Sequence, residues 1–332
     1  MAALRIVARS GLARVGISEA LRNLATPTYF PAVSSTCSTA PPDSLIRLLI
    51  DARYPRALIS AFDCKRRMEG GVSAAAGLLA RLRSEACTVV LDSGLFECQV
   101  LGESSWSSSD YDEVSTFVPH DLLFSFDGPS GSRPQHRPPP RAGSESTAVR
   151  ETRLVHIVHG TDRASIVGGA GQVLHSGSPL GIAIPDREAG PDLAARVRTV
   201  GAVRRVINDT DETLLLHVLG CGNPVVMAAY TMAGADTFDS LDWAQGAVDI
   251  RSLTQTDPLL LRRTGCKCKV CVDLPGPDGQ LALLHNLLFY QEFSSQLREM
   301  VRSETVLDFL QAFTSKEYAA SLAEVLTQAT SE

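Results

Sequence analysis

The sequence predicts an α/β protein built on a (β/α)8 barrel, with an inserted zinc-binding subdomain and C-terminal helices. Eight short runs rich in Val, Ile, Leu and Phe recur along the chain, and most are separated by segments with helical spacing of apolar residues. The runs do not alternate cleanly between polar and apolar residues, as is typical of parallel strands buried on both faces. Three cysteines then crowd into six residues late in the chain.

The amino-acid composition excludes several classes of protein. The 332 residues are 44% hydrophobic, which excludes intrinsic disorder of the whole chain. The net charge of −6 excludes a protein that coats nucleic acid nonspecifically, so any such contact must come from local patches. No stretch approaches the roughly 18 apolar residues of a membrane span, and no membrane partner is expected. The cysteine cluster indicates metal in a reducing compartment, so we expect a cytoplasmic protein.

The elements are expected in the following order. Residues 1–25 form an N-terminal segment, interpreted as a surface segment that leads into the first strand. Residues 26–246 form the barrel, with helices including Val72–Ser84, Gly190–Arg205 and Pro224–Met232. The expected strands are Tyr29–Ser34, Ala57–Phe62, Thr88–Asp92, Leu122–Asp127, Leu154–His159, Gly181–Ile184, Leu214–Leu219 and Thr237–Asp239.

Two segments interrupt this alternation. Gly128–Arg150 holds five prolines and several arginines, so it is either a solvated loop or an arm that touches phosphates. Residues 247–332 form the zinc-binding subdomain and the terminal helices that close the barrel, with helical stretches at Leu281–Val301 and Glu304–Phe313.

Polar side chains stand where several of the strands end. Asp92, Asp127 and Asp239 end the third, fourth and eighth strands, and His159 ends the fifth. The carboxyl ends of barrel strands share one mouth, so these side chains are expected to converge there. A single Asp after a strand is often only a helix N-cap. Several at one mouth can share nucleophilic and acid/base roles at a glycosidic carbon, or hold Mg²⁺.

Histidines and glycines also stand near the strand ends. His156 and His159 are three residues apart on a strand and point to opposite faces, so they cannot ligate one ion and only His159 is a candidate for the mouth. Glycines in LGIAIP (Gly181) and HVLGCGNP (Gly220 and Gly222) are interpreted as turns that follow strands. They either let a flat ligand approach the backbone or serve tight turns.

The cysteine cluster has the composition of a metal site. Cys266, Cys268 and Cys271 form CxCxxC, and His285 follows. Three thiolates and one imidazole complete the tetrahedral shell of a structural zinc and leave no open position for catalysis. The other five cysteines are expected to be small buried hydrophobes.

These motifs together resemble the tRNA-guanine transglycosylase family. The resemblance runs in family order over most of the chain, through TPTYFPAVSS, LDSGLF, FSFDG, VHG, HVLGCGNP, ADTFDS, CKCKVC and LLHNLLFYQEF. It implies a (β/α)8 barrel with an inserted zinc subdomain and a pentosyltransferase that exchanges guanine in a polynucleotide for a 7-deazaguanine base.

By this resemblance Asp239 is the nucleophile that attacks C1′, and Asp92 is the general acid/base. The implied base-binding residues are Phe96, Asp127, His159, Gly181, Ile182 and Leu219. Among them Phe96 and Leu219 sandwich the ring, and His159 stands where the family usually has Gln. The zinc ligands are Cys266, Cys268, Cys271 and His285.

The sequence leaves several alternatives open. The acceptor is tRNA or, as in a related branch of the family, DNA, and the inserted base is preQ0, preQ1 or queuine, the last of the queuosine type. The chain forms a homodimer in one reading and acts as a non-catalytic partner subunit in another. A metal-dependent barrel hydrolase that uses Asp92, Asp127, Asp239 and His159 is the remaining alternative.

Overall fold

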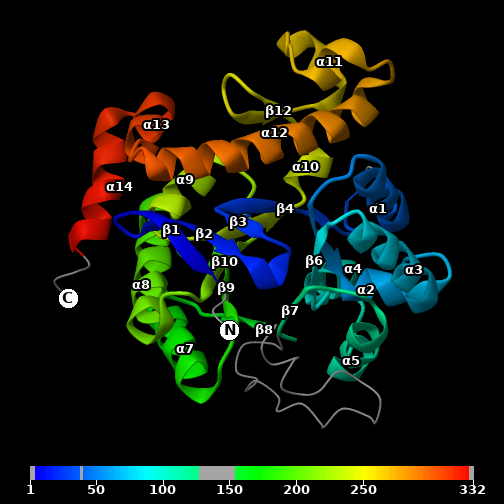
Figure 1. Cartoon of the computed structure of the whole chain (residues 1–332), viewed down its shortest axis with the longest axis horizontal. Coiled ribbons are helices and arrows are strands. Elements are labelled where there is room, and N and C mark those ends of the chain that lie inside the picture. Colours follow the sequence, from blue (N-terminus) through cyan, green and yellow to red (C-terminus); the bar gives the residue numbers. More distant parts are fainter. Residues whose placement is uncertain (1–3, 38–39, 127–153, 329–332) are drawn as a thin grey trace.

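The computed structural model describes residues 4–37, 40–126 and 154–328. At its centre, eight parallel strands close into a barrel in which each strand neighbours the next and β11 pairs with β4 (Figure 1). The predicted barrel is confirmed, and each strand overlaps its predicted run. The strands are β4 (Thr28–Val33), β5 (Arg56–Ser60), β6 (Thr88–Asp92), β7 (Leu122–Phe124), β8 (Leu154–Ile157), β9 (Gly181–Pro185), β10 (Leu215–Leu219) and β11 (Thr237–Ser240).

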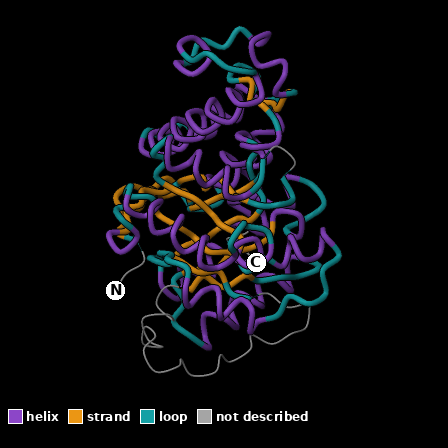
Figure 2. Tube along the Cα trace, turned by 90° about the vertical axis from the view of Figure 1, so that its right-hand side faces the viewer, coloured by secondary structure: helices purple, strands orange, loops and turns teal. Residues whose placement is uncertain are grey.

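Helices surround the barrel strands (Figure 2). The predicted helical stretches 72–84, 190–205 and 224–232 correspond to α3, α8 and α9. Local chemistry sets several starts: the Asp192 side chain caps α8, and Asn223 caps α9 before Pro224 in its first turn. The helices are α1 (Pro42–Asp51), α2 (Ala61–Arg66), α3 (Gly71–Ser84), α4 (Leu95–Leu101), α5 (Ser108–Phe117), α7 (Arg163–Ser176), α8 (Leu193–Asp211) and α9 (Pro224–Met232), with the short η2 (Asp186–Glu188) after β9.

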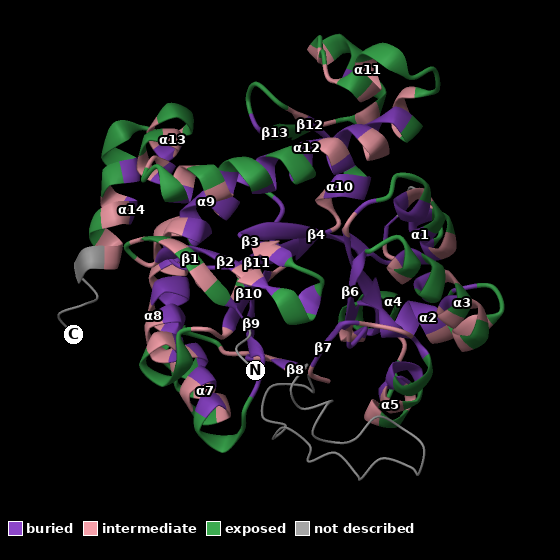
Figure 3. Ribbon diagram, in the orientation of Figure 1, coloured by how far each residue is buried: buried purple, intermediate pink, exposed green. Residues whose placement is uncertain are grey.

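Two apolar layers hold the barrel. The outer layer lies between strands and helices, where Ile59, Leu91 and Ile184 are buried. The inner layer fills the barrel itself with Phe30 and Phe124 among others, so the barrel is a packed core and not a pore. Figure 3 shows most of the barrel strands buried and the outer helix faces exposed.

The N-terminal segment, expected to be a surface segment that leads into the first strand, forms a small antiparallel sheet of β1 (Arg5–Ser10), β2 (Ala13–Ser18) and β3 (Leu24–Thr26), with η1 (Glu19–Leu21) between the last two. The sheet is exposed along β1 and buried along β2. Leu4, Leu21 and Leu24 join the core inside the barrel. Leu4 N–H bonds the Thr213 carbonyl just before β10, so this sheet covers the amino-terminal end of the barrel.

A lobe and terminal helices follow the barrel. The lobe holds α10 (Asp242–Gln245), β12 (Ala247–Asp249), β13 (Thr254–Thr256), η3 (Pro258–Thr264) and α11 (Lys269–Asp273). The long α12 (Asp278–Arg302) packs on the lobe near its start and against β1, β2 and β4 along its length (Figure 1). It covers the predicted stretch 281–301, and α13 (Val306–Phe313) begins two residues after the start of the predicted stretch 304–313, whereas α14 (Lys316–Gln328) was not predicted. None of the helices in the described ranges is long and apolar enough to cross a membrane.

Candidate active site and metal centre

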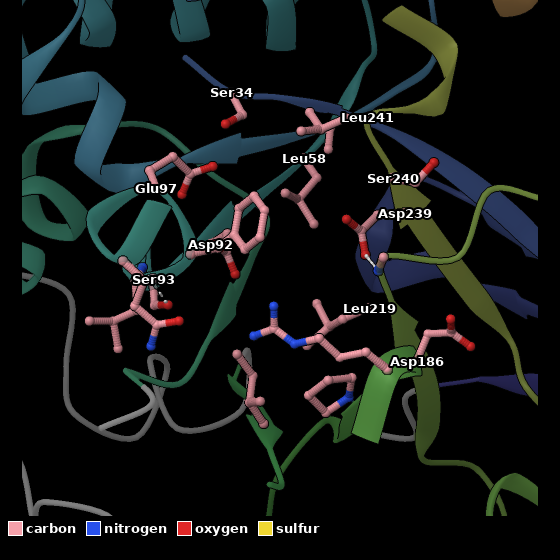
Figure 4. Close-up of a pocket in the computed structure, with 18 of the residues that line it drawn as sticks. Ser34, Leu58, Asp92, Ser93, Glu97, Asp186, Leu219, Asp239, Ser240 and Leu241 are labelled. Carbon is pink, nitrogen blue, oxygen red and sulfur yellow. Dashed lines mark hydrogen bonds between the residues drawn. The ribbon is translucent and has the colours of Figure 1, made fainter. Parts of the chain in front are cut away.

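The carboxyl ends of the strands surround a cavity of about 640 Å³. Its walls come from the ends of β4, β6, β9, β10 and β11 and from the first turns of α4 and η2. Five of the residues predicted from the sequence line it: Asp92, Phe96, His159, Leu219 and Asp239. In Figure 4 the Asp92 and Asp239 side chains face this cavity from opposite sides.

Asp239 is a buried carboxylate with one well-held oxygen. This residue, 7% exposed, stands on β11. His217 Nε2 lies 2.9 Å from Oδ1, and the Gly220 N–H donates to the same oxygen at 3.1 Å. Gly220 holds a left-handed φ of +75°, which explains a glycine after β10. Among the described residues no hydrogen bond ends on Oδ2, so Oδ2 is the oxygen suited to attack.

Asp92 is positioned by the turn that follows β6. The Gly94 N–H donates to Asp92 Oδ2 at 3.0 Å. Gly94 has a φ of +80°, and a Cβ there would lie 2.5 Å from the Phe62 Cβ, so the DSG turn requires its glycine. Two residues on, Phe96 is 42% exposed, with the Arg187 guanidinium 5.9 Å from its ring centroid. An exposed aromatic face is thus available beside one of the two facing carboxylates.

His159 is paired with a residue that sequence reasoning missed. Its Nδ1 lies 3.0 Å from each carboxylate oxygen of Glu188 in η2, and the Gly160 N–H donates to the same carboxylate. A carboxylate accepts, so Nδ1 carries a proton. The pair joins the ends of β8 and β9 at the cavity wall. Nothing in the local sequence around Glu188 signalled it, because the two residues meet only through the barrel closure.

Three predicted base-binding residues do not line the cavity or are not described. Gly181 and Ile182 start β9, whereas Pro185 at the other end of that strand lines the cavity. Interpreting Gly181 as a turn after a strand was therefore wrong. Its small size serves packing, because a Cβ would lie 2.4 Å from the Leu215 carbonyl oxygen on β10. Asp127 and the arm 128–150 lie outside the described residues.

The cavity is rich in acids beyond the two predicted ones. Glu97, Asp186, Glu188 and Asp242 also line it. Burial raises the pKa of Glu97 despite hydrogen bonds from Ser34 and Ser60, and the Asp239 charge raises it further. Behind it, burial and the Glu97 charge raise the pKa of Asp63 to about 7. Ionisation of Glu97 in this cavity is thus disfavoured.

The predicted Cys3His cluster is assembled in the lobe. The Cys266, Cys268 and Cys271 sulfurs lie 3.7, 3.3 and 3.5 Å from His285 Nδ1. Tetrahedral zinc with Zn–S of about 2.3 Å and Zn–N of about 2.0 Å requires S···N distances of about 3.5 Å, so the four ligands suit this ion. His285 Nε2 donates to the Val248 carbonyl at 2.8 Å, which leaves Nδ1 for the metal. The other five cysteines are buried, as predicted.

Comparison with known proteins gives two relatives. No family model matches the chain. A tRNA-guanine(15) transglycosylase of Archaeoglobus fulgidus is 26% identical over 205 residues, which is 55% of this chain and 40% of the relative. A tRNA-guanine(15) transglycosylase of Methanococcus aeolicus is 25% identical over 111 residues, which is 29% of this chain and 17% of the relative. Each alignment therefore spans less than half of the relative's own length.

Proposed function

We infer that this chain, which is similar to two archaeal tRNA-guanine(15) transglycosylases, is a member of the tRNA-guanine transglycosylase family and a pentosyltransferase that exchanges guanine in tRNA for a 7-deazaguanine base. The observation that carries the proposal is that Asp92 and Asp239 face one cavity from opposite sides (Figure 4). Its 640 Å³ lies within the roughly 300–1,000 Å³ of small-molecule sites. Phe96 and Leu219 offer apolar surface to a flat base.

The proposed reaction is a double displacement with retention. Asp239 Oδ2 forms a bond to C1′ while the C1′–N9 bond breaks, and its electron pair leaves with guanine, which Asp92 protonates. The incoming base loses a proton to Asp92 and attacks C1′, and the Asp239 carboxylate is released. This follows the logic of a retaining glycosidase with two carboxylates. The incoming base is preQ0, preQ1 or queuine, and His159 with Glu188 contacts its polar edge.

Zinc, when bound by Cys266, Cys268, Cys271 and His285, would have a structural role. A closed shell of four protein ligands leaves no position for a substrate. His285 lies on α12 and the cysteines lie in the lobe, so the metal would fix the lobe to the helix. The metal-dependent hydrolase alternative is disfavoured, because among the described residues the acids of the cavity do not form a group of three or more side chains that could hold a metal ion.

The proposal is tested by trapping the covalent intermediate. The protein is incubated with labelled guanine and either total tRNA or duplex DNA, and both base exchange and a denaturation-resistant adduct are measured. We expect tRNA to be labelled, Asp239→Asn to abolish the adduct, and Asp209→Asn, an exposed position on α8, to leave it intact. Labelled DNA instead would identify the DNA-modifying alternative. No exchange and no adduct with either polymer would reject the enzyme in favour of a non-catalytic partner subunit.

A further inference from the structure

His217 on β10 is a buried histidine that the mechanism above does not use. It is 3% exposed and points into the barrel, where its ring lies 4.8 Å from the Phe124 ring. In the strand register it sits beside Thr237 on β11, and Asp239 is two residues further along the same face. The histidine, the threonine and the nucleophile candidate therefore form one row inside the barrel.

The hydrogen bonds of this row define where the protons are. His217 Nε2 lies 2.9 Å from Asp239 Oδ1, and Nδ1 lies 2.8 Å from Thr237 Oγ1. An ionised carboxylate only accepts, so Nε2 carries the proton that is donated to Asp239. In the neutral ring Nδ1 is then an acceptor, and the Thr237 hydroxyl donates to it. Thr237 thus fixes the tautomer and His217 fixes the carboxylate.

We propose that His217 is a positioning residue that, together with the Gly220 N–H, reserves Oδ1 of Asp239 and directs Oδ2 toward C1′. The proposal rests on the proposed function. Once Oδ2 is bonded to C1′, Oδ1 is the carbonyl oxygen of the ester. In the second half-reaction the C1′–Oδ2 bond breaks as the new C1′–N9 bond forms, and the electron pair returns to the carboxylate. The two donors stabilise that returning charge.

This role predicts a specific kinetic pattern. Loss of the His217 donor should slow release of the adduct by about 10²-fold, the typical effect of one such preorganised donor. Release should slow at least as much as formation, so the adduct accumulates at steady state. A side chain that only fills space would lower both rates through misfolding, without changing their ratio.

The experiment compares three variants of the full chain in single turnovers with guanine-containing tRNA, followed by a chase with labelled free guanine. His217→Leu removes the donor, His217→Gln supplies another N–H, and Thr237→Val removes the donor to Nδ1 while keeping the ring. We expect slow release in His217→Leu, at least tenfold recovery in His217→Gln, and intermediate release in Thr237→Val.

Each outcome decides the matter. Unchanged release in folded His217→Leu overturns the inference, and if that variant fails to fold, unchanged release in Thr237→Val does so. Failure of His217→Gln to exceed folded His217→Leu also overturns it, since the donor is then irrelevant. If wild-type protein forms no adduct with tRNA or DNA, the proposed function itself fails and the inference falls with it.

Discussion

Replacing Asp236 with Asn should be among the most destabilising single changes in the protein. Asp236 is fully buried before β11 and accepts from Arg14 at 2.7 and 2.6 Å, from Arg204, and from the Leu216 N–H at 2.8 Å. Burial alone would raise the pKa of its carboxyl, but the charges of Arg14 and Arg204 lower it. The two arginines are 1% and 0% exposed, so neither can reach water when the carboxylate is lost.

The size of the expected loss of stability follows from the two buried arginines, Arg14 and Arg204, that lose their carboxylate partner. Removing one member of a buried ion pair costs about 3–5 kcal/mol, and here one carboxylate serves two guanidinium groups, so we expect the upper part of that range. Arg14 keeps the Glu212 and Leu214 carbonyls and Arg204 keeps the Gly234 carbonyl, which prevents a larger loss. Against a typical total stability of about 5–15 kcal/mol, the variant would be marginally folded.

Urea unfolding followed by tryptophan fluorescence measures this effect, because Trp106 and Trp243 are both buried. Asp209→Asn on the exposed face of α8 is the control and should stay within about 0.5 kcal/mol of wild type. Adding Arg14→Met to Asp236→Asn removes one unpaired cation and should recover part of the loss. A loss below about 1 kcal/mol with an unchanged urea dependence would refute the reasoning.

Three further changes test other parts of the structure. Folding raises the pKa of Asp63 to about 7, so ionisation of this carboxyl disfavours the folded state. The stability of the wild type should therefore fall relative to that of Asp63→Asn as the pH rises from about 4 to about 7, and then level off. The expected fall is on the order of 2–4 kcal/mol. Urea unfolding at pH 5 and 8 measures this, and equal pH dependence in both proteins would contradict it. Cys268→Ser should lose the bound zinc and lower the unfolding midpoint, with Cys37→Ser, outside the cluster, keeping full zinc content by elemental analysis; full stability without zinc would argue against a structural metal. Gly181→Ala should destabilise by about 1–3 kcal/mol through its clash with Leu215, whereas Gly168→Ala on exposed α7 should stabilise by about 0.5–1 kcal/mol; a neutral Gly181→Ala in urea unfolding would show that the backbone relaxes freely.

The sequence was sufficient for the barrel and for the pairing of Asp92 with Asp239. The carboxyl ends of all parallel strands lie at the same end of the barrel. A side chain at the carboxyl end of a predicted strand can therefore be placed there once the strands are identified. This does not apply to Gly181, which begins the strand expected at Gly181–Ile184 and therefore lies at the opposite end from the cavity. Interpreting it as a turn after a strand was in conflict with that expected strand.

Other features depend on register or on contacts distant in sequence. His217 faces into the barrel in the register that places it beside Thr237 on β11. The local sequence HVLG does not determine that register. Glu188 meets His159 from 29 residues away, across two strand ends. The N-terminal sheet did carry a signal, since Ala13, Val15 and Ile17 recur at every second residue after a Gly11 turn, which is typical of a hairpin strand.

The sheet that seals the floor of the barrel has a kinetic consequence for any base exchange in this cavity. With Leu4, Leu21 and Leu24 packed beneath the inner core, the described residues offer a small molecule no rear exit. The departing and the incoming base would then use the same opening of the cavity, so the departing purine must leave before its replacement can enter. Such a site should display ping-pong kinetics, in which free guanine competes directly with the incoming base.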